Sequence, residues 1–173
     1  ALSINGVQNE IAIWTTPADG LADSKAKWTA LVGRDDDVTN ADMRGDEIFL
    51  LSHKDAPTFK VLVLKAGQPL AAAKVLVPAE PDRVIEGIHA ASDALYVMAR
   101  KGAYSQLLRI PAGSTAIEEV ALPFEGHIGE MFSAPRAPGV TIQMASWGRP
   151  PSQYAYDPAK KSFADLALGQ KGD

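Results

Sequence analysis

The sequence predicts an all-β protein, a fragment of a β-propeller with about three complete four-stranded antiparallel blades plus part of a fourth. The first observation is a repeat, because Thr58, Ser105 and Ser152 follow one another at intervals of 47 residues. The second is its length, which fits four short strands with their turns and matches propeller repeats of about 40–50 residues. The third is that Gly and Pro separate short apolar runs, with no sustained helical period. The last strands repeat at steps of 45, 45 and 46 residues as Leu31–Val32, Leu76–Val77, Ala121–Leu122 and Ala167–Leu168.

Residues 1–33 are predicted to form an incomplete blade. Ala1–Ile4 resembles the end of a strand, and Glu10–Thr16 and Lys27–Val32 are predicted to be the next two strands. A helical turn is expected only at Leu21–Lys27. The unit therefore lacks its first strand and most of its second. Because the chain opens directly in strand-like sequence without an initiator Met, we expect it to be cut from a longer protein.

Residues 34–79 are predicted to form the first complete blade. Its central strand, Ile48–Leu51, is a continuous apolar run, which is typical of a strand covered on both faces. A blade that stacks between two neighbours buries its sheet in this way. The four expected strands are Val38–Arg44, Glu47–Leu51, Phe59–Leu64 and Lys74–Pro78.

Residues 80–125 and 126–171 are predicted to be two further blades of the same kind. Pro and Gly again mark the turns between their strands. The expected strands are Arg83–Ala90, Ala94–Ala99, Gln106–Ile110 and Glu119–Leu122 in one blade, and Ile128–Ser133, Gly139–Ala145, Gln153–Tyr156 and Phe163–Leu168 in the other.

Composition excludes several classes of partner. The net charge of −4 argues against a nucleic-acid surface, which needs clustered Lys and Arg. The absence of Cys excludes disulfides and Cys-based zinc sites. No apolar run approaches the ~20 residues of a membrane span. We expect no membrane partner and no cofactor, and the compartment is left open between cytoplasm and periplasm.

Histidines are the first candidates for a base or a metal site. His53, His89 and His127 fall in three different predicted blades, and His89 and His127 are 38 residues apart rather than one full repeat. That mismatch places them at different depths along their strands. Structural or channel-lining roles are therefore favoured over metal binding or catalysis.

Two other groups of residues are weaker candidates for a metal site or a catalytic nucleophile. Asp35–Asp37 could suggest calcium, but the ligand spacing of a calcium loop is missing, so an exposed loop is favoured. Ser52–His53 and Ser114–Thr115 have no base or orienting partner at an interpretable position. We therefore name no catalytic, cofactor-binding or metal residue.

Aromatic and basic side chains could bind peptides. Trp147 lies in a Gly/Pro-rich loop and could be exposed, whereas packing is the default for aromatic residues on strands. The arginines are ambiguous between solvated rim positions and steering of peptides. The residues considered are Trp14, Trp28, Trp147, Tyr154 and Tyr156, together with Arg44, Arg83, Arg100 and Arg136.

Several motifs resemble the propeller of the prolyl oligopeptidase family of serine peptidases. Ser52–Pro57 (SHKDAP) followed by Phe59–Val61 resembles the family's bend between two strands. Trp28 before an apolar pair is similar to the preceding blade. Ala145–Pro151 and Tyr154–Pro158 resemble the final blade, which precedes the return to the hydrolase domain. The resemblance covers nearly all of this chain and about a quarter of a whole enzyme of that family.

The resemblance implies a non-catalytic role. Members join a propeller to an α/β-hydrolase domain that carries Ser, Asp and His, and the propeller restricts entry to short peptides. No G-x-S-x-G nucleophile elbow occurs here, so we expect this chain alone to have no peptidase activity. Residues 5–9 (NGVQN) contain no basic residue where the family's longer bend can carry an Arg. We therefore transfer no substrate contact.

The resemblance also names the expected partners. These are the α/β-hydrolase catalytic domain of the parent chain and, through it, short proline-containing peptides. Open terminal sheet faces predict self-association of the fragment, as a homodimer. The alternatives are a stand-alone half-propeller used for protein interaction and, with less support, a propeller glycosidase or lyase with its site in the channel.

Overall fold

A computed structural model describes residues 2–4, 7–21 and 26–168 of the chain. The described residues form strands and three short 3-10 helices, η1 (Ala18–Gly20), η2 (Arg34–Asp36) and η3 (Leu70–Ala72). Most of the helical turn expected at 21–27 lies outside the described residues. The strands are β1 (Leu2–Ile4), β2 (Ala12–Thr15), β3 (Thr29–Val32), β4 (Val38–Arg44), β5 (Glu47–Ser52), β6 (Lys60–Lys65), β7 (Lys74–Val77), β8 (Arg83–Ala90), β9 (Ala94–Lys101), β10 (Tyr104–Pro111), β11 (Glu118–Val120), β12 (His127–Phe132), β13 (Val140–Ser146), β14 (Arg149–Asp157) and β15 (Ser162–Asp165).

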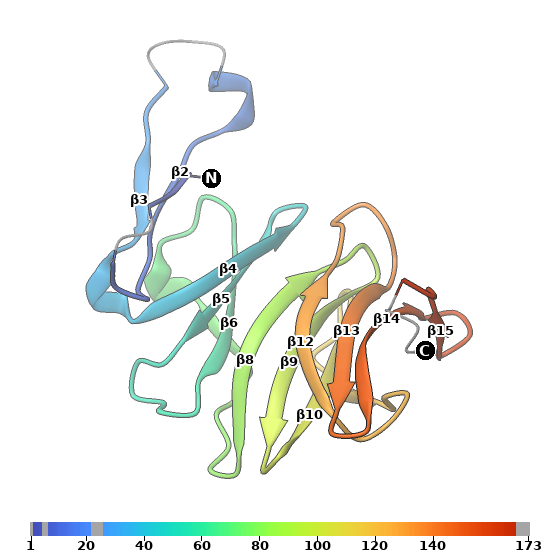
Figure 1. Ribbon diagram of the computed structural model, residues 1–173. Coiled ribbons are helices and arrows are strands. Elements are labelled where there is room, and N and C mark those ends of the chain that lie inside the picture. The colour runs from blue at the N-terminus through green and yellow to red at the C-terminus, as the bar shows by residue number, and fades with distance from the viewer. Residues whose placement is uncertain (1, 5–6, 22–25, 169–173) are drawn as a thin grey trace. The chain divides into compact units, whose positions relative to one another are not determined.

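The strands assemble into four antiparallel sheets. The first has three strands in the order β1-β2-β3, and the others have four strands each, β4 to β7, β8 to β11 and β12 to β15. Within each sheet, strands that follow one another in sequence are neighbours, so each sheet is a meander (Figure 1). Three four-stranded sheets and a shorter one confirm the predicted all-β propeller fragment.

The chain divides into two compact units, Ala1–Ala79 and Glu80–Asp173. In the first unit, the core lies between the β1–β3 sheet and the β4–β7 sheet. A backbone bond of 2.8 Å from Ile11 N to Val38 O also joins these sheets. The core is apolar because the alternate residues of each strand point to the shared interior; its buried members are Ile11, Ile13, Leu31, Val32, Val38, Ile48, Leu50 and Leu64.

The second unit packs the β8–β11 sheet against the β12–β15 sheet. Tyr96 and Leu107 from the first sheet meet Ile142 and Met144 from the second, and all four side chains are fully buried. The rings of Tyr96 and Tyr156 meet edge to face across this core, with their centroids 6.0 Å apart. The unit therefore has a continuous apolar interior with the geometry that aromatic pairs prefer.

Central strands differ in how many faces they bury. In β9, Leu95, Tyr96 and Val97 are all fully buried, so both faces of the strand are covered, as predicted for the central strand of a blade. In β13, Val140 and Ile142 are buried but Thr141 between them is only half-buried. The face of β13 that carries Thr141 is therefore less completely covered than either face of β9.

In the second unit, the last strand of each sheet ends earlier than the sequence predicts. β15 stops at Asp165, whose Oδ1 accepts a hydrogen bond of 2.8 Å from Ala167 N, and Ala167 adopts a left-handed φ of 53°. This turn removes Ala167–Leu168 from the ladder. β11 stops at Val120, before the expected Ala121–Leu122.

The third strand of the last sheet is longer than expected. β14 begins at Arg149 and includes Pro150 and Pro151, which were expected in a loop. No pairing with β13 is made at the two prolines, because the register shifts between Met144 and Ser146. Proline has no N–H to donate, so an unpaired bulge accommodates it.

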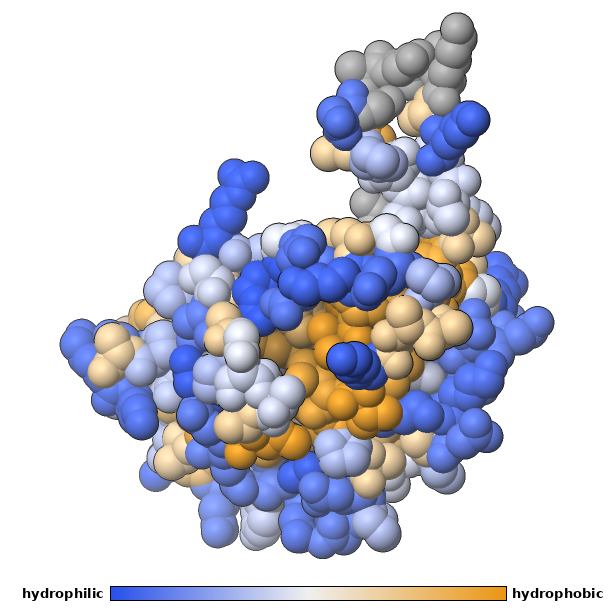
Figure 2. All heavy atoms as spheres, turned by 180° about the vertical axis from the view of Figure 1, so that it is seen from behind, coloured by the Kyte–Doolittle hydropathy of each residue, from blue (hydrophilic) through white to orange (hydrophobic). Residues whose placement is uncertain are grey.

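Polar residues cover most of the face drawn in Figure 2, with apolar residues gathered in one region. Charged residues make up 22% of the sequence. Among the described residues, no helix is both long enough and apolar enough to cross a membrane.

Candidate functional site

Two adjoining hollows at one end of the second unit form the candidate site. They lie where the β9–β10 turn, the connection between β11 and β12 and the β13–β14 turn come together. We call them the strand hollow, of about 470 Å³, and the turn hollow, of about 530 Å³. Both volumes are in the range of small-ligand pockets, about 300–1,000 Å³. Tyr104 and Glu125 line both hollows.

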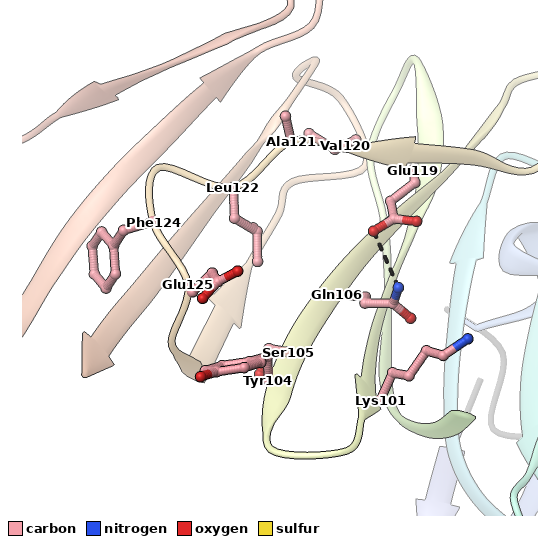
Figure 3. A pocket seen from close by; sticks show the side chains of 10 residues that line it. All are labelled: Lys101, Tyr104, Ser105, Gln106, Glu119, Val120, Ala121, Leu122, Phe124 and Glu125. Carbon is pink, nitrogen blue, oxygen red and sulfur yellow. Dashed lines mark hydrogen bonds between the residues drawn. The ribbon is translucent and has the colours of Figure 1, made fainter. Parts of the chain in front are cut away.

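The strand hollow has polar and apolar walls (Figure 3). Gln106 Nε2 donates to Glu119 Oε1 at 3.1 Å, and the buried Oε1 of Gln106 has no hydrogen-bond partner in the structure. Leu122 and Phe124 supply the apolar wall from the β11–β12 connection. Lys101 also lines the hollow, but its ammonium pairs with Asp82 at 2.6 Å.

The turn hollow is walled by exposed rings. Tyr104 is 52% exposed and Trp147 is fully exposed at the tip of the β13–β14 turn. Glu125 and His127, both also exposed, line the same hollow. Glu125 is the one carboxylate among the residues that line this hollow.

Ser105, which lines the strand hollow, attaches β10 to the β11–β12 connection and to the start of β12. Its backbone N–H donates to Gly126 O at 3.0 Å, and its Oγ accepts from Ile128 N at 2.9 Å. The hydroxyl can then donate to His127 Nδ1, 3.4 Å away. Ser105 is only 6% exposed and already holds a backbone N–H. This Ser–His pair therefore joins two sheets and does not present a nucleophile.

An arginine from β14 stacks on the β11–β12 connection. The guanidinium of Arg149 lies over the ring of Phe124, 4.7 Å from its centroid. The same ring meets Tyr154 edge to face at 5.9 Å. The end of the unit thus holds one cation on an aromatic face.

The structure does not bring the three histidines together. His53 follows β5 in the first unit, where its Nε2 lies 3.1 Å from Glu10 Oε1. A backbone hydrogen bond to the Glu10 carboxylate lowers the pKa of this group, and the hydrogen bond with His53 lowers it further. His89 lies within β8 and His127 begins β12. In the described part of the chain, no three His, Asp or Glu side chains gather as a metal site would require.

The Asp run and the Ser pairs have local roles. Asp36 Oδ2 accepts from Gly33 N at 2.8 Å, and Asp37 has a left-handed φ of 54°, so the run forms the turn between β3 and β4. The buried Ser52 hydroxyl lies 3.3 Å from Asp36 O and accepts from Lys54 N. Ser114 Oγ accepts from Ala116 N at 3.0 Å within a turn.

Most of the remaining candidates pack against other side chains or form ion pairs. Tyr156 is buried, Trp14 is half-buried in β2 and Trp28 is 42% exposed before β3. Of the aromatic candidates, only Trp147 lines one of the two hollows described above. The arginines pair with nearby carboxylates, Arg44 with Glu47, Arg83 with Glu80 and Arg100 with Glu86, while Arg136 is exposed between β12 and β13.

A polar cluster at the opposite end of the β8 and β9 strands escaped the sequence analysis. Asp93, in the β8–β9 turn, accepts from Gly139 N at 2.8 Å and from the Tyr96 hydroxyl at 2.9 Å. Arg109 donates to the same carboxylate through Nε and Nη2, at 3.2 and 3.1 Å, and also pairs with Glu118 at 2.8 Å. Burial opposes ionisation of Asp93, but these hydrogen bonds outweigh it and lower its pKa.

The spacing of Asp93 and Gly139 was the one sequence signal that could have predicted their contact. They are 46 residues apart, one repeat, and so occupy corresponding turns of neighbouring sheets. The exposed residues of the turn hollow carried no comparable pattern, because exposure of Tyr104 and Glu125 depends on how distant segments pack.

Consecutive four-stranded meanders, stacked face to face in the second unit, define a segment of a β-propeller domain. The family model described as the N-terminal β-propeller domain of prolyl oligopeptidase matches residues 3–165. The chain belongs to this family. No curated protein matches it.

Solved structures share the fold at low identity. Prolyl oligopeptidase B from Galerina marginata, without ligand, is 14% identical with a TM-score of 0.75, over 96% of this chain and 24% of its own. Oligopeptidase B from Leishmania major is 18% identical with a TM-score of 0.74, over 94% and 24%. A structure from a study of two prolyl endopeptidases is 16% identical with a TM-score of 0.74, over 91% and 23%. The chain therefore spans about a quarter of these proteins.

Proposed function

We propose that this chain is a non-catalytic propeller segment that limits access of short peptides to the α/β-hydrolase domain of a prolyl-oligopeptidase-like serine peptidase. The match to the propeller-domain family over residues 3–165 carries the proposal. The hydrolase domain would be encoded outside this chain, and short proline-containing peptides would be the substrates of the whole protein.

Rigid walls support a gating role. Both faces of β9 are buried. The two sheets of the second unit are joined by hydrogen bonds at both ends, through Ser105 at one end and Asp93 at the other. A wall of this kind excludes large substrates by shape and needs no reactive group. Each sheet would be one blade, at 1–33, 34–79, 80–125 and 126–171.

Self-association of the isolated chain is part of the proposal. Phe132 is 53% exposed on β12, and β15 pairs only with β14 within its sheet, so an apolar side chain and a strand edge are both available. Unpaired edges favour addition of another strand. Light scattering at micromolar concentration should give a dimer mass, and a clean monomer would contradict this.

Removal of the propeller from the whole parent protein tests gating. The ratio of kcat/KM for a short proline-containing peptide to that for an unfolded protein would be measured with and without it. We expect the ratio to fall when the propeller is removed, because large substrates then gain entry. An unchanged ratio would contradict gating. A parent reading frame with no hydrolase domain would favour the half-propeller interaction module instead. The purified 173-residue chain should hydrolyse neither substrate.

A further inference from the structure

We propose that the turn hollow binds the guanidinium group of an arginine side chain on an extended peptide. The groups that would hold it are the Glu125 carboxylate and the exposed rings of Tyr104 and Trp147. This proposal goes beyond gating and does not depend on it, because it concerns a site on the propeller itself.

Charge selects a cation. Glu125 forms no ion pair with any described residue, and it is the one acidic side chain among the residues that line the hollow. Two cations at this end of the unit are engaged elsewhere, because Lys101 pairs with Asp82 and Arg149 stacks on Phe124. A cationic ligand therefore meets an available carboxylate, with no Lys or Arg among the residues that line the hollow.

The rings select a flat cation. A cation over an aromatic face is attracted by the ring quadrupole, and guanidinium, being planar, stacks on rings better than ammonium does. Tyr104 and Trp147 line the same hollow as Glu125 and expose large aromatic surfaces to water, which core packing does not account for. The Arg149–Phe124 pair, at 4.7 Å, is the same interaction made within the chain at the neighbouring connection.

The backbone connection that carries Glu125 is held in place before a ligand arrives. Ser105 binds both Gly126 and Ile128, the residues on either side of His127. A Cβ at Gly126 would collide with Ala145 O, so the connection lies tightly against β13. Tyr104 and Glu125 are shared by both hollows, and Figure 3 shows Tyr104 at the bottom of the strand hollow with Glu125 above it. A fixed backbone loses little entropy at this connection on binding.

Titration of the 173-residue chain with a blocked Gly-Arg-Gly tripeptide tests the proposal. The readout is the indole N–H resonance of Trp147, assigned by its loss in Trp147→Phe, with the Trp28 resonance as an internal reference. The matched ligand replaces Arg with citrulline, which keeps the shape and removes the charge. We expect a saturable shift at Trp147 with Arg and binding weaker by about fivefold or more with citrulline.

Variants separate a site from general attraction to an acidic protein. Glu125→Gln should weaken Arg binding by about fivefold, and added salt should weaken it in the parent. Glu130→Gln removes the same charge from an exposed position on β12 and should leave binding unchanged. Equal affinity for Arg and citrulline, equal shifts at Trp147 and Trp28, no saturable shift, or equal effects of the two Glu variants would overturn the proposal.

Discussion

Replacing Asp93 with Ala should destabilise the second unit more than replacing any single exposed charged residue with Ala. The carboxylate accepts four hydrogen bonds, from Gly139 N, Tyr96 Oη and two nitrogens of Arg109. Asp93 and Arg109 side chains are only 17% and 16% exposed. The bond to Gly139 crosses from one sheet to the next.

The expected loss of unfolding free energy is about 3 kcal/mol. Removing one member of a buried pair costs about 3–5 kcal/mol. We take the lower end because Arg109 keeps Glu118, at 2.8 Å, and because the pair is partly solvated. For a chain of this size the melting temperature would fall by about 6–12 °C. Asp82→Ala is the control, since its pair with Lys101 is exposed and such pairs contribute about 0–1 kcal/mol.

The effect should depend on pH in one direction. The hydrogen bonds lower the pKa of Asp93 from its ordinary value of 3.8 in spite of its burial. A carboxyl whose pKa is lower in the folded state stabilises that state above the unfolded pKa, and this is lost as pH falls through the folded pKa. The stability gap between the parent and Asp93→Ala should therefore be full at neutral pH and narrow below about pH 4.

Denaturant unfolding followed by circular dichroism measures the gap, and hydrogen exchange at the Gly139 amide measures the local bond. We expect exchange at Gly139 to accelerate in Asp93→Ala and to stay at the parent rate in Asp82→Ala. If Asp93→Ala unfolded within about 0.5 kcal/mol of the parent, the carboxylate would not join the two sheets as described.

Three further predictions concern side chains and turns. Leu50→Asp and Val97→Asp, at fully buried positions, should each cost several kcal/mol in denaturant unfolding, and a loss below about 1 kcal/mol would contradict their burial. Ser105→Ala leaves the Ile128 N–H without its acceptor and should cost about 1–3 kcal/mol, with faster exchange at that amide as the decisive reading. Gly139→Ala should cost more than about 3 kcal/mol because φ is +83° and a Cβ meets Tyr156 O; Gly45→Ala, with φ of +60° and open space, should cost only about 1 kcal/mol, and equal melting temperatures would refute the close approach.

Local pattern was sufficient for the sheets. The strands β4 and β8 have the predicted bounds because each is closed by a turn whose residues are visible in sequence, such as Gly45 after Arg44. The period of the repeat predicted the succession of meanders. The early end of β15 was missed, since it depends on a hydrogen bond from Ala167 N to Asp165 rather than on hydropathy.

The candidate site was beyond such reasoning. Tyr104, Glu125 and Trp147 come from three connections and meet only because two sheets pack together. Trp147 was considered as exposed from its Gly/Pro surroundings, but its neighbours across the hollow could not be named. Ser105 was noticed as a marker of the repeat, and its hydroxyl's role appeared only with the register of β10 against the β11–β12 connection.

The paired attachments of the second unit determine where its chain can be cut. At one end Ser92 N and Asp93 bind the connection between β12 and β13, and at the other Ser105 binds the connection between β11 and β12. A protein engineer who separated β11 from β12 would expose the apolar core and leave backbone groups unpaired at both ends. The two sheets should therefore be expressed, swapped or transplanted together as one module of residues 80–168.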